Sequence, residues 1–432
     1  MHTSFHSVVK LNFLIRTFLE RSIQYFRDRS DFEILNFEFR ILNSYPNVYI
    51  YHFELIAGIM ASSPDEWFQV KDAGQLDSPA LIIFPDRVKE NIRILVSMID
   101  DVGRLRPHVK TNKSREACQL MMNAGISKFK CATIAEGEML ASCGAKDVLL
   151  AYQPVGPKMK RFFELIQEFP GTLFSCLIDN MDSATQIDSF FKSNHRRVPV
   201  YMDLNVGMNR TGIVPGKEAI GLYNDCCSAE GIQPVGLHVY DGHIRSTDFE
   251  RRKKACDEAF DSVLRLKDAL AEKKLPEPVI IAGGTPTFSI HCKRKKIECS
   301  PGTFIYWDKG YQDLCTEQAF LPAAIVISRV ISKPDSNIIC LDLGHKSIAS
   351  EGELARRVHF LNASDLKPIG HSEEHLVLEV PRGNSHRTGD LLYGLPFHIC
   401  PTVALYERAY TVQNGTVTGE WKNVARDKKI NF

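Results

Sequence analysis

The sequence has almost no net charge, and it lacks the features that define several large classes of protein. Lysine and arginine total 53, aspartate and glutamate total 52, and the net charge is +1. Nucleic-acid and anionic-membrane binding need a surplus of basic residues, so we expect neither partner. The basic runs at 251–254 and 293–296 are short, and we expect them on solvated surface. No apolar run approaches the 18 or so residues of a membrane span.

The cysteines lack any paired spacing. There are 12, and none belongs to a C-x-x-C motif. In a chain of 432 residues this count does not indicate a disulfide scaffold. We therefore expect a reducing, cytoplasmic location in which most thiols are small core residues.

The first sixty residues have a composition of their own. Residues 1–59 contain eight Phe and four Tyr but one Gly and one Pro. Charged residues interrupt the apolar stretches, so neither a secretory signal nor a transit peptide is indicated. Two interpretations stay open. The segment is a helical appendage, or it lies outside the native coding sequence and translation starts at Met60.

From residue 81 onward, short apolar runs alternate with stretches long enough for helices. Eight runs fit the strands of a parallel sheet covered on both faces: 105–111, 128–134, 147–153, 173–179, 198–206, 234–241, 278–285 and 297–308. Eight strand–helix units over about 230 residues predict an α/β fold, a (β/α)8 barrel of the TIM type. An open doubly wound sheet is the alternative, but no G-x-G-x-x-G follows the first strand.

After about residue 320 the pattern changes to strands joined by turns, with no long helix. This change predicts a separate C-terminal β domain. The predicted organisation has four parts: an extension at 1–60, a segment at 61–80 that joins the β domain, the barrel at 81–322, and the β domain at 323–432.

Polar residues gather where the predicted barrel strands end, which is where barrel enzymes carry their sites. Lys110 ends the first strand. A desolvated lysine there gives a neutral amine that forms a Schiff base with an aldehyde, and the alternative is a lysine whose tip reaches solvent. Gly-Gly-Thr at 283–285 and Pro-Gly-Thr at 301–303 are small-residue turns on the last strands, a usual phosphate site of barrels. Together these features indicate a phosphorylated aldehyde cofactor.

These residues resemble the motifs of a known enzyme group. Arg-Pro-His-Val-Lys-Thr at 106–111 is similar to the cofactor-lysine motif of the fold-type III pyridoxal-phosphate enzymes, the alanine-racemase-like barrels. Gly-Met-Asn-Arg-Thr-Gly at 207–212 is similar to their arginine motif. His-Ile-Cys-Pro-Thr-Val-Ala-Leu at 398–405 and Ser-Glu-Glu-His at 372–375 resemble the D-threonine aldolase and D-serine dehydratase branch. The resemblance runs from about residue 67 to the C-terminus.

The resemblance implies pyridoxal 5'-phosphate as cofactor and a role for each matching residue. The contacts to the cofactor would be Lys110 at the aldehyde, Arg210 at the phenolic oxygen, Tyr240 against the ring, and Gly284, Thr285, Gly302 and Thr303 around the phosphate. His398 and Cys400 would bind a divalent metal, zinc or manganese, beside the substrate. The resemblance also implies a homodimer that acts on a small-molecule β-hydroxy-D-amino acid.

The metal pair depends on that resemblance, because a histidine near a cysteine is by itself usually incidental. In a strand, side chains two residues apart point to the same face, so His398 and Cys400 would share one ion. A competing motif at 371–375 has the form H-x-x-E-H, which needs a helix to bind one metal. It leads into a predicted strand, where residues four apart lie about 13 Å apart, so we do not expect a protease-type site.

Two positions depart from the pattern of the group. Asn112 stands where a histidine commonly follows the lysine–threonine pair, which puts any role of that histidine in doubt. Ser300 stands where racemases of this fold place an arginine that faces the pyridine nitrogen. The loss of that cation changes how strongly the ring withdraws electrons, so simple racemase activity is not expected.

The expected activity is that of a lyase, and two reactions compete. Removal of the hydroxyl proton, with His243 as candidate base, would break the Cα–Cβ bond and give glycine and an aldehyde. Removal of the α-proton by Lys110, with the metal assisting loss of hydroxide, would give a keto acid and ammonia. Residues 401–405 resemble the aldolases, which we favour, whereas Cys400 resembles the dehydratases. A non-catalytic pyridoxal-phosphate carrier is a third alternative, against which the extra β domain argues.

Overall fold

The structure is a computed structural model that describes residues 66–432. The predicted extension at 1–60, and the hypothesis of a start at Met60, lie outside the described residues. Phe68–Phe432 form one compact unit. Within the described part of the chain, no helix combines the length and the apolar character needed to cross a membrane.

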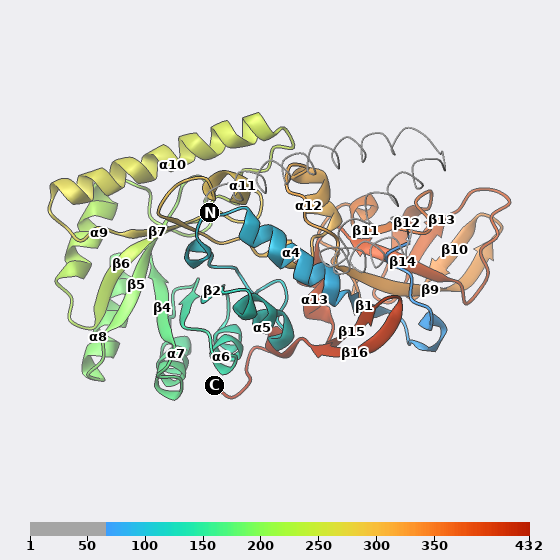
Figure 1. Ribbon diagram of the computed structural model, residues 1–432, viewed down its shortest axis with the longest axis horizontal. Helices are drawn as coiled ribbons and strands as arrows, with labels where there is room; N and C mark the ends of the chain where they lie inside the picture. The colour runs from blue at the N-terminus through green and yellow to red at the C-terminus, as the bar shows by residue number, and fades with distance from the viewer. Residues whose placement is uncertain (1–65) are drawn as a thin grey trace, which may run out of the picture. The chain divides into compact units, whose positions relative to one another are not determined.

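A curled sheet of seven parallel strands forms the barrel (Figure 1). Its strands follow one another in chain order: β2 Lys128–Cys131, β3 Asp147–Leu150, β4 Leu173–Ile178, β5 Val198–Leu204, β6 Ile232–Val239, β7 Val279–Ala282 and β8 Ile297–Cys299. The segment 105–109 closes the gap between the two edges. The N–H of Arg106 donates to Cys299 O (2.8 Å), and the N–H of Lys130 donates to Pro107 O (2.9 Å). The predicted barrel is confirmed.

The first predicted strand differs from the others. Instead of a continuous strand at 105–111, the structure has two isolated bridges, Leu105 to Cys299 and His108 to Lys130, followed by a turn at 109–112. Pro107 has no N–H to continue the ladder, which explains the interruption. The turn places Lys110 at the carboxyl end of the barrel.

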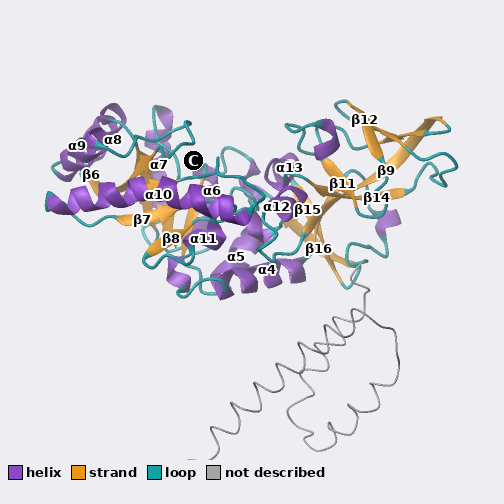
Figure 2. Cartoon of the chain, turned by 90° about the horizontal axis from the view of Figure 1, so that it is seen from above, coloured by secondary structure: helices purple, strands orange, loops and turns teal. Residues whose placement is uncertain are grey.

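Helices follow the strands and cover the outside of the barrel (Figures 1 and 2). They are α4 Pro85–Ser97, α5 Arg115–Asn123, α6 Ile134–Ser142, α7 Pro157–Glu168, α8 Met181–Ser193, α9 Lys217–Cys227, α10 Phe249–Glu272 and α11 Phe288–His291. Side-chain caps start several of them: Ser114 accepts from the N–H of Ala117, and Thr133 accepts from the N–H of Glu136. Such caps satisfy N–H groups that the first helical turn leaves unpaired.

The second sheet is mainly antiparallel and confirms the predicted C-terminal β domain. Its strands are β1 Ala80–Ile83, β9 Ala324–Asp335, β10 Ile338–Leu341, β11 Val358–Phe360, β12 Lys367–His371, β13 Leu376–Glu379, β14 Leu391–Pro396, β15 Arg408–Gln413 and β16 Thr416–Lys422. Strand β1 pairs antiparallel with β9 and parallel with β15, so the chain enters this sheet before it enters the barrel. Two short helices complete the unit, α12 Lys309–Leu314 and α13 Ile399–Leu405.

Part of the barrel interior is charged, although barrels are usually filled with branched apolar side chains like the buried Leu149, Leu177 and Ile281 of this chain. Arg106 is completely buried and pairs with Asp147 (2.6 Å) and with Glu298 (2.7 Å). Lys128 contacts Glu298 as well. Paired in this way, the buried charges satisfy one another inside the protein.

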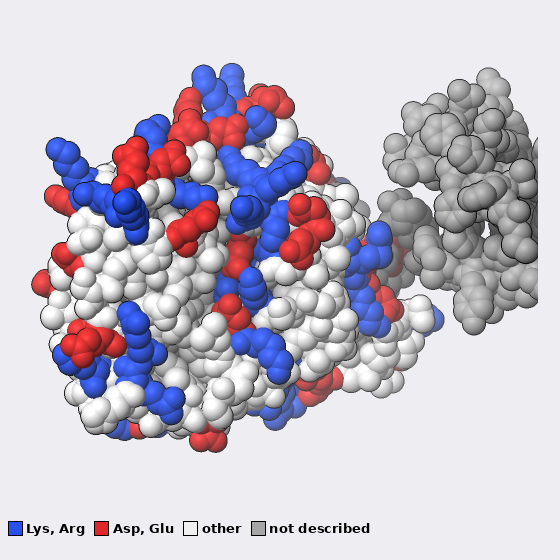
Figure 3. Space-filling model, turned by 60° about the vertical axis from the view of Figure 1, so that its left-hand side comes forward, with Lys and Arg blue, Asp and Glu red and all other residues white. Residues whose placement is uncertain are grey.

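One residue of the two basic runs is buried, although we expect both runs on solvated surface. Arg252 in α10 is completely buried, and its guanidinium donates to Leu314 O (2.8 Å) and pairs with Glu317 (2.6 Å). Its place one helical turn before Cys256 and two before Phe260 puts it on the inner face of α10. On the barrel side of the molecule, basic and acidic side chains lie interspersed (Figure 3).

Candidate active site

The predicted cofactor residues meet at the carboxyl ends of the barrel strands. Lys110 Nζ lies 6.0 Å from the centroid of the Tyr240 ring, and Arg210 Cζ lies 4.9 Å from the same centroid. Tyr240 directly follows β6. A Cβ atom on Gly284 would lie 3.1 Å from Tyr240 Cε2, so the ring also touches the turn after β7. One tyrosine ring therefore connects Lys110, Arg210 and Gly284.

The two small-residue turns form a cradle of backbone N–H groups. The N–H groups of Gly302 (3.2 Å) and Thr303 (3.1 Å) both donate to Thr285 Oγ1. Residue 302 must be small, because a Cβ there would lie 2.9 Å from His108 O. Converging N–H groups of this kind hold phosphate oxygens. The predicted phosphate residues are thus brought together.

A buried polar atom beside the cradle supports the same ligand. Ser300 Oγ is buried and has no hydrogen-bond partner within the described protein. A buried hydroxyl without a partner is costly, and a polar group of a bound cofactor would satisfy it. The cradle, Ser300 and the nearby Lys110 together fit a phosphorylated aldehyde such as pyridoxal phosphate.

His398 and Cys400 lie together, but not on a strand. His398 is the N-cap of α13, which begins at Ile399, and Thr402 Oγ1 donates to His398 O (2.9 Å). The prediction of a shared strand face was therefore wrong. Their side chains are nevertheless close enough for each to shift the pKa of the other. Cys400 Sγ lies 3.1 Å from Thr111 Oγ1 and 3.7 Å from Thr303 Oγ1, so the pair adjoins both the lysine turn and the cradle.

The charges around this pair favour a thiolate. Burial by itself would raise the pKa of the Cys400 thiol, but the hydrogen bond and charge of His398, with the charge of Lys110, lower it. Burial would lower the pKa of His398, whereas Cys400, Asp308 and Glu351 raise it to about 9. Thiolate and imidazole are donors that zinc-like ions accept. His398 also lines a cavity of about 520 Å³, which has room for a small substrate.

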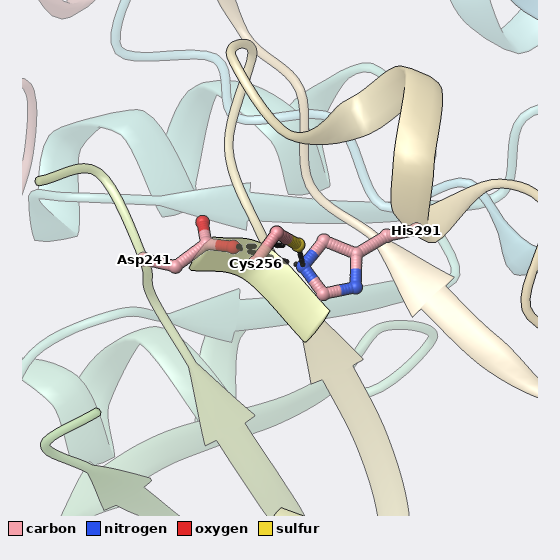
Figure 4. Close-up of side chains that lie close together, drawn as sticks. All are labelled: Asp241, Cys256 and His291. Carbon is pink, nitrogen blue, oxygen red and sulfur yellow. Dashed lines mark hydrogen bonds and ion pairs between the residues drawn. The ribbon is translucent and has the colours of Figure 1, made fainter. Parts of the chain in front are cut away.

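A second cluster of donors consists of Asp241, which follows Tyr240 in the chain, Cys256 of α10 and His291 of α11 (Figure 4). His291 Nε2 is 2.9 Å from Asp241 Oδ2 and 3.3 Å from Cys256 Sγ. Among residues 66–432, these three form the one group of at least three His, Cys, Asp or Glu residues whose donor atoms all lie within 4.8 Å of one another. Such spacing is compatible with a metal ion. The sequence analysis missed this group, because only Asp241 adjoins a recognised motif.

The hydrogen bonds of this cluster indicate a structural role, because they connect two turns of the active site. Arg294 Nη1 lies 2.5 Å from His291 Nδ1. A guanidinium only donates, so Nδ1 accepts and the ring hydrogen sits on Nε2, facing Asp241. Thr287 Oγ1 donates to Asp241 Oδ1 (2.8 Å) and accepts from the N–H of Gly284 (3.4 Å). The cluster thereby ties the turn that carries Tyr240 to the turn that carries Gly284.

The other predicted residues are placed as follows. His243 is exposed and packs on the arginine loop, since a Cβ on Gly207 would lie 2.7 Å from its Nε2. Asn112 is buried, and Cys118 Sγ contacts its Oδ1 at 3.9 Å. The H-x-x-E-H motif lies on a hairpin between β12 and β13, and His371 Nε2 donates to Leu343 O (3.0 Å). The expectation that this motif is not helical is confirmed.

Known proteins resemble this chain along most of its length. It is 24% identical to a D-threonine aldolase of Arthrobacter sp over 384 residues, which cover 86% of this chain and 98% of that protein. It is 25% identical to a D-threo-3-hydroxyaspartate dehydratase of Delftia sp. (strain HT23) over 366 residues, or 77% of this chain and 93% of the other. The crystal structure of D-threonine aldolase from Filomicrobium marinum superposes with a TM-score of 0.75 at 23% identity, covering 82% of this chain and 96% of that chain.

Two family descriptions match the two halves of the fold. Residues 323–412 match a serine dehydratase domain. Residues 83–309 match the family described as alanine racemase, N-terminal domain, and this stretch is more than half of the chain. The chain therefore belongs to the alanine racemase N-terminal domain family, whose fold is that of the fold-type III pyridoxal-phosphate enzymes.

Proposed function

We propose that this chain is a lyase that depends on pyridoxal phosphate and a divalent metal and cleaves β-hydroxy-D-amino acids to glycine and an aldehyde. The observation that carries the proposal is the contact of 3.1 Å between Cys400 Sγ and Thr111 Oγ1. It supports the proposal because Cys400 is one of the two proposed metal donors, and Thr111 follows Lys110, the proposed cofactor lysine, in the chain. A substrate amino acid whose amine displaces Lys110 from the cofactor would then lie beside the metal pair, with its β-hydroxyl within reach of the ion.

Pyridoxal phosphate, when bound, supplies a sink for the electrons left on the α-carbon, and a divalent ion supplies a Lewis acid for the β-oxygen. The residues of the chain bind the cofactor and position its ring. Lys110 holds the cofactor through its amine. Gly284, Thr285, Gly302 and Thr303 hold the phosphate with backbone N–H groups and hydroxyls. Arg210 and Tyr240, stacked on each other, fix the position of the cofactor ring.

The remaining site residues act on the substrate. His398 and Cys400 bind the metal and orient the β-hydroxyl. His243, at the mouth of the barrel beside the arginine loop, takes the hydroxyl proton. A positioned base of this kind contributes about 10²–10⁴-fold to the rate. Zinc or manganese is the metal that we propose for this donor set.

The second candidate reaction is β-elimination to a keto acid and ammonia. Cys400 favours it, because the relative from Delftia is named a dehydratase and cysteine is the ligand that resembles the dehydratases. In that reaction Lys110 removes the α-proton, and the metal pair assists the loss of hydroxide. Retro-aldol cleavage stays our first choice because residues 401–405 resemble the aldolases, and the Arthrobacter relative carries that name.

The proposal also includes the cellular location, the oligomeric state and the domain organisation. All 12 cysteines are free, which supports a reducing, cytoplasmic location. We also propose a homodimer, on the resemblance to the barrel group alone, and the four-part domain organisation with boundaries at residues 60, 80 and 322. The N–H of Lys71 donates to Gly415 O (2.7 Å), between β15 and β16, which supports the assignment of residues 61–80 to the β domain.

Product identification by NMR tests the proposed reaction. The purified protein receives pyridoxal phosphate, a divalent metal and D-threonine. Glycine with acetaldehyde is the expected outcome, and L-threonine is the matched control that should give no product. 2-Oxobutanoate with ammonia would establish the elimination instead. The absence of any product with D-threonine and with 3-hydroxy-D-aspartate would favour the non-catalytic carrier and contradict the proposal.

A further inference from the structure

A second amine, which is buried, faces the same ring as Lys110. Lys130 lies on β2 and is 2% exposed. Its Nζ is 5.9 Å from the centroid of the Tyr240 ring, whereas Lys110 Nζ is 6.0 Å from it. A buried lysine without a carboxylate partner is rare, because its charge is costly to desolvate. Nothing in the cofactor contacts described above gives Lys130 a role.

Two further residues hold the Lys130 amine in place. Its Nζ lies 3.3 Å from His238 Nε2, and His238 Nδ1 lies 2.7 Å from Asp203 Oδ1. A carboxylate only accepts, so Nδ1 carries the ring hydrogen and Nε2 accepts a hydrogen from Lys130. The chain Asp203–His238–Lys130 thus has the orienting logic by which proteins prepare an amine or hydroxyl for proton transfer. Because Lys130 donates a hydrogen to His238, the lone pair of a neutral Lys130 amine stays available to accept a proton.

The charges around Lys130 come from several barrel segments. The titratable and charged groups that face it are Arg106 and His108 of the segment 105–109, Lys110 of the turn that follows, Asp203 of β5, His238 of β6, and Tyr240 and Asp241 after β6. Burial and the charge of Lys110 lower the pKa of Lys130 to about 7, despite the opposite effect of the two aspartates. Burial and Lys130 also lower the pKa of His238, so that ring stays neutral. Lys130 is therefore able to gain or lose a proton near neutral pH.

We propose that Lys130 is a positioning residue that accepts the proton which Lys110 must lose before its amine adds to the aldehyde of pyridoxal phosphate. The inference rests on the proposed function. One N–H bond breaks at Lys110 Nζ and one forms at Lys130 Nζ, so the pair keeps a single positive charge. Two amines that face the same ring, one of them buried, do not readily hold two protons, which favours this sharing. Only a neutral amine attacks an aldehyde, so the transfer prepares Lys110 to capture its cofactor.

The test is the rate at which the full-length apoprotein captures pyridoxal phosphate, followed by absorbance from about pH 6 to pH 10. Three proteins are compared: the wild type, Lys130→Met and Lys128→Met. Lys128 is the matched control, because it lies two residues earlier on β2, faces the same side and pairs with Glu298. We expect Lys130→Met to be about tenfold slower near pH 7 and equal to the wild type near pH 10, where water removes the proton. Lys128→Met should follow the wild type throughout.

A second variant distinguishes the loss of a proton acceptor from a folding defect or a loss of charge. Lys130→Arg keeps the size and the positive charge but accepts no proton, so it should be as slow near pH 7 as Lys130→Met. Slowing by the same factor at every pH, or no slowing, would overturn the inference. A wild type that captures pyridoxal phosphate at no pH would instead contradict the proposed function. The two failures are therefore distinct.

Discussion

The guanidinium of Arg210 lies over the ring of Tyr240, with its Cζ 4.9 Å from the ring centroid. Cation–π contacts of this kind stabilise by about 0.5–2 kcal/mol. Because the same ring touches Gly284 and faces Lys110, it sets the relative positions of the lysine and the phosphate cradle. The binding of the cofactor should therefore respond to small displacements of Tyr240.

Gly284→Ala tests this dependence. The added methyl group would lie 3.1 Å from Tyr240 Cε2, so the ring must shift by a few tenths of an ångström. We expect the Kd for pyridoxal phosphate to rise about tenfold, which corresponds to about 1.4 kcal/mol. Fluorescence titration of the apoprotein measures it. Gly171→Ala is the matched control, because no atom lies within 4 Å of its new methyl group. Equal Kd values for the two variants would contradict the role of Tyr240.

His243→Gln tests the base that we propose for the cleavage. Glutamine keeps a polar side chain on the arginine loop but removes the base. Cleavage of D-threonine to glycine should slow about 10²–10⁴-fold, while the Kd for pyridoxal phosphate stays unchanged. Steady-state kinetics provide the readout, with the exposed His375→Gln as control. An unchanged kcat would remove His243 from the mechanism.

Replacement of two cysteines identifies which cluster binds the metal. Cys400→Ala removes a thiol of lowered pKa, and we expect the bound zinc or manganese to be lost after dialysis. Cys256→Ser alters the Asp241–Cys256–His291 cluster, where Arg294 already supplies positive charge, and we expect the metal content to stay the same. Elemental analysis of both proteins decides. Metal lost from Cys256→Ser and kept in Cys400→Ala would reverse the assignment.

The ion pairs inside the barrel should dominate its stability. Arg106→Met takes the guanidinium away from Asp147 and leaves the buried Glu298 paired with Lys128 alone, and removal of one member of a buried pair costs about 3–5 kcal/mol. Urea unfolding followed by circular dichroism measures the loss. Arg408→Met breaks pairs with Glu407 and Glu420 on the surface, and it should cost about 1 kcal/mol or less. A similar small loss for Arg106→Met would show that the interior charges are dispensable.

The stability of the chain should depend on pH through Lys130. Its pKa is about 7 in the folded protein, against an ordinary value of 10.5. Between these values the unfolded chain binds the extra proton, so the free energy of unfolding contributed by this group rises with pH. Below about pH 7 the amine is charged in both states, and the cost of burying it is complete. We expect Lys130→Met to be the more stable protein near pH 7, with an advantage that shrinks towards pH 9. Urea unfolding at several pH values checks this, and an advantage independent of pH would contradict it.

Much of the fold was predictable because apolar periodicity reports strands and helices directly. The barrel strands and the C-terminal sheet follow from short apolar runs and the turns between them. The exceptions have local causes. Pro107 interrupts the first predicted strand, and residues 399–405 form a helix although their apolar run reads equally well as a strand. Short apolar runs do not distinguish the two conformations.

The site was predictable only where a motif marks it. Lys110, Arg210 and the two glycine turns lie in recognisable motifs, and the structure brings them together. Lys130, His238 and His291 belong to no motif. They contact other polar groups because the fold brings together residues that are distant in sequence, which a single sequence does not reveal.

Chemical labelling locates pyridoxal phosphate on the chain and so tests the role of Lys110. The full-length protein, loaded with the cofactor, is reduced with borohydride and digested, and mass spectrometry identifies the modified lysine. We predict modification of Lys110 alone in the wild type, and its loss in Lys110→Ala. Modification of another lysine, or none in the wild type, would contradict the claim that Lys110 at the mouth of this barrel carries the cofactor.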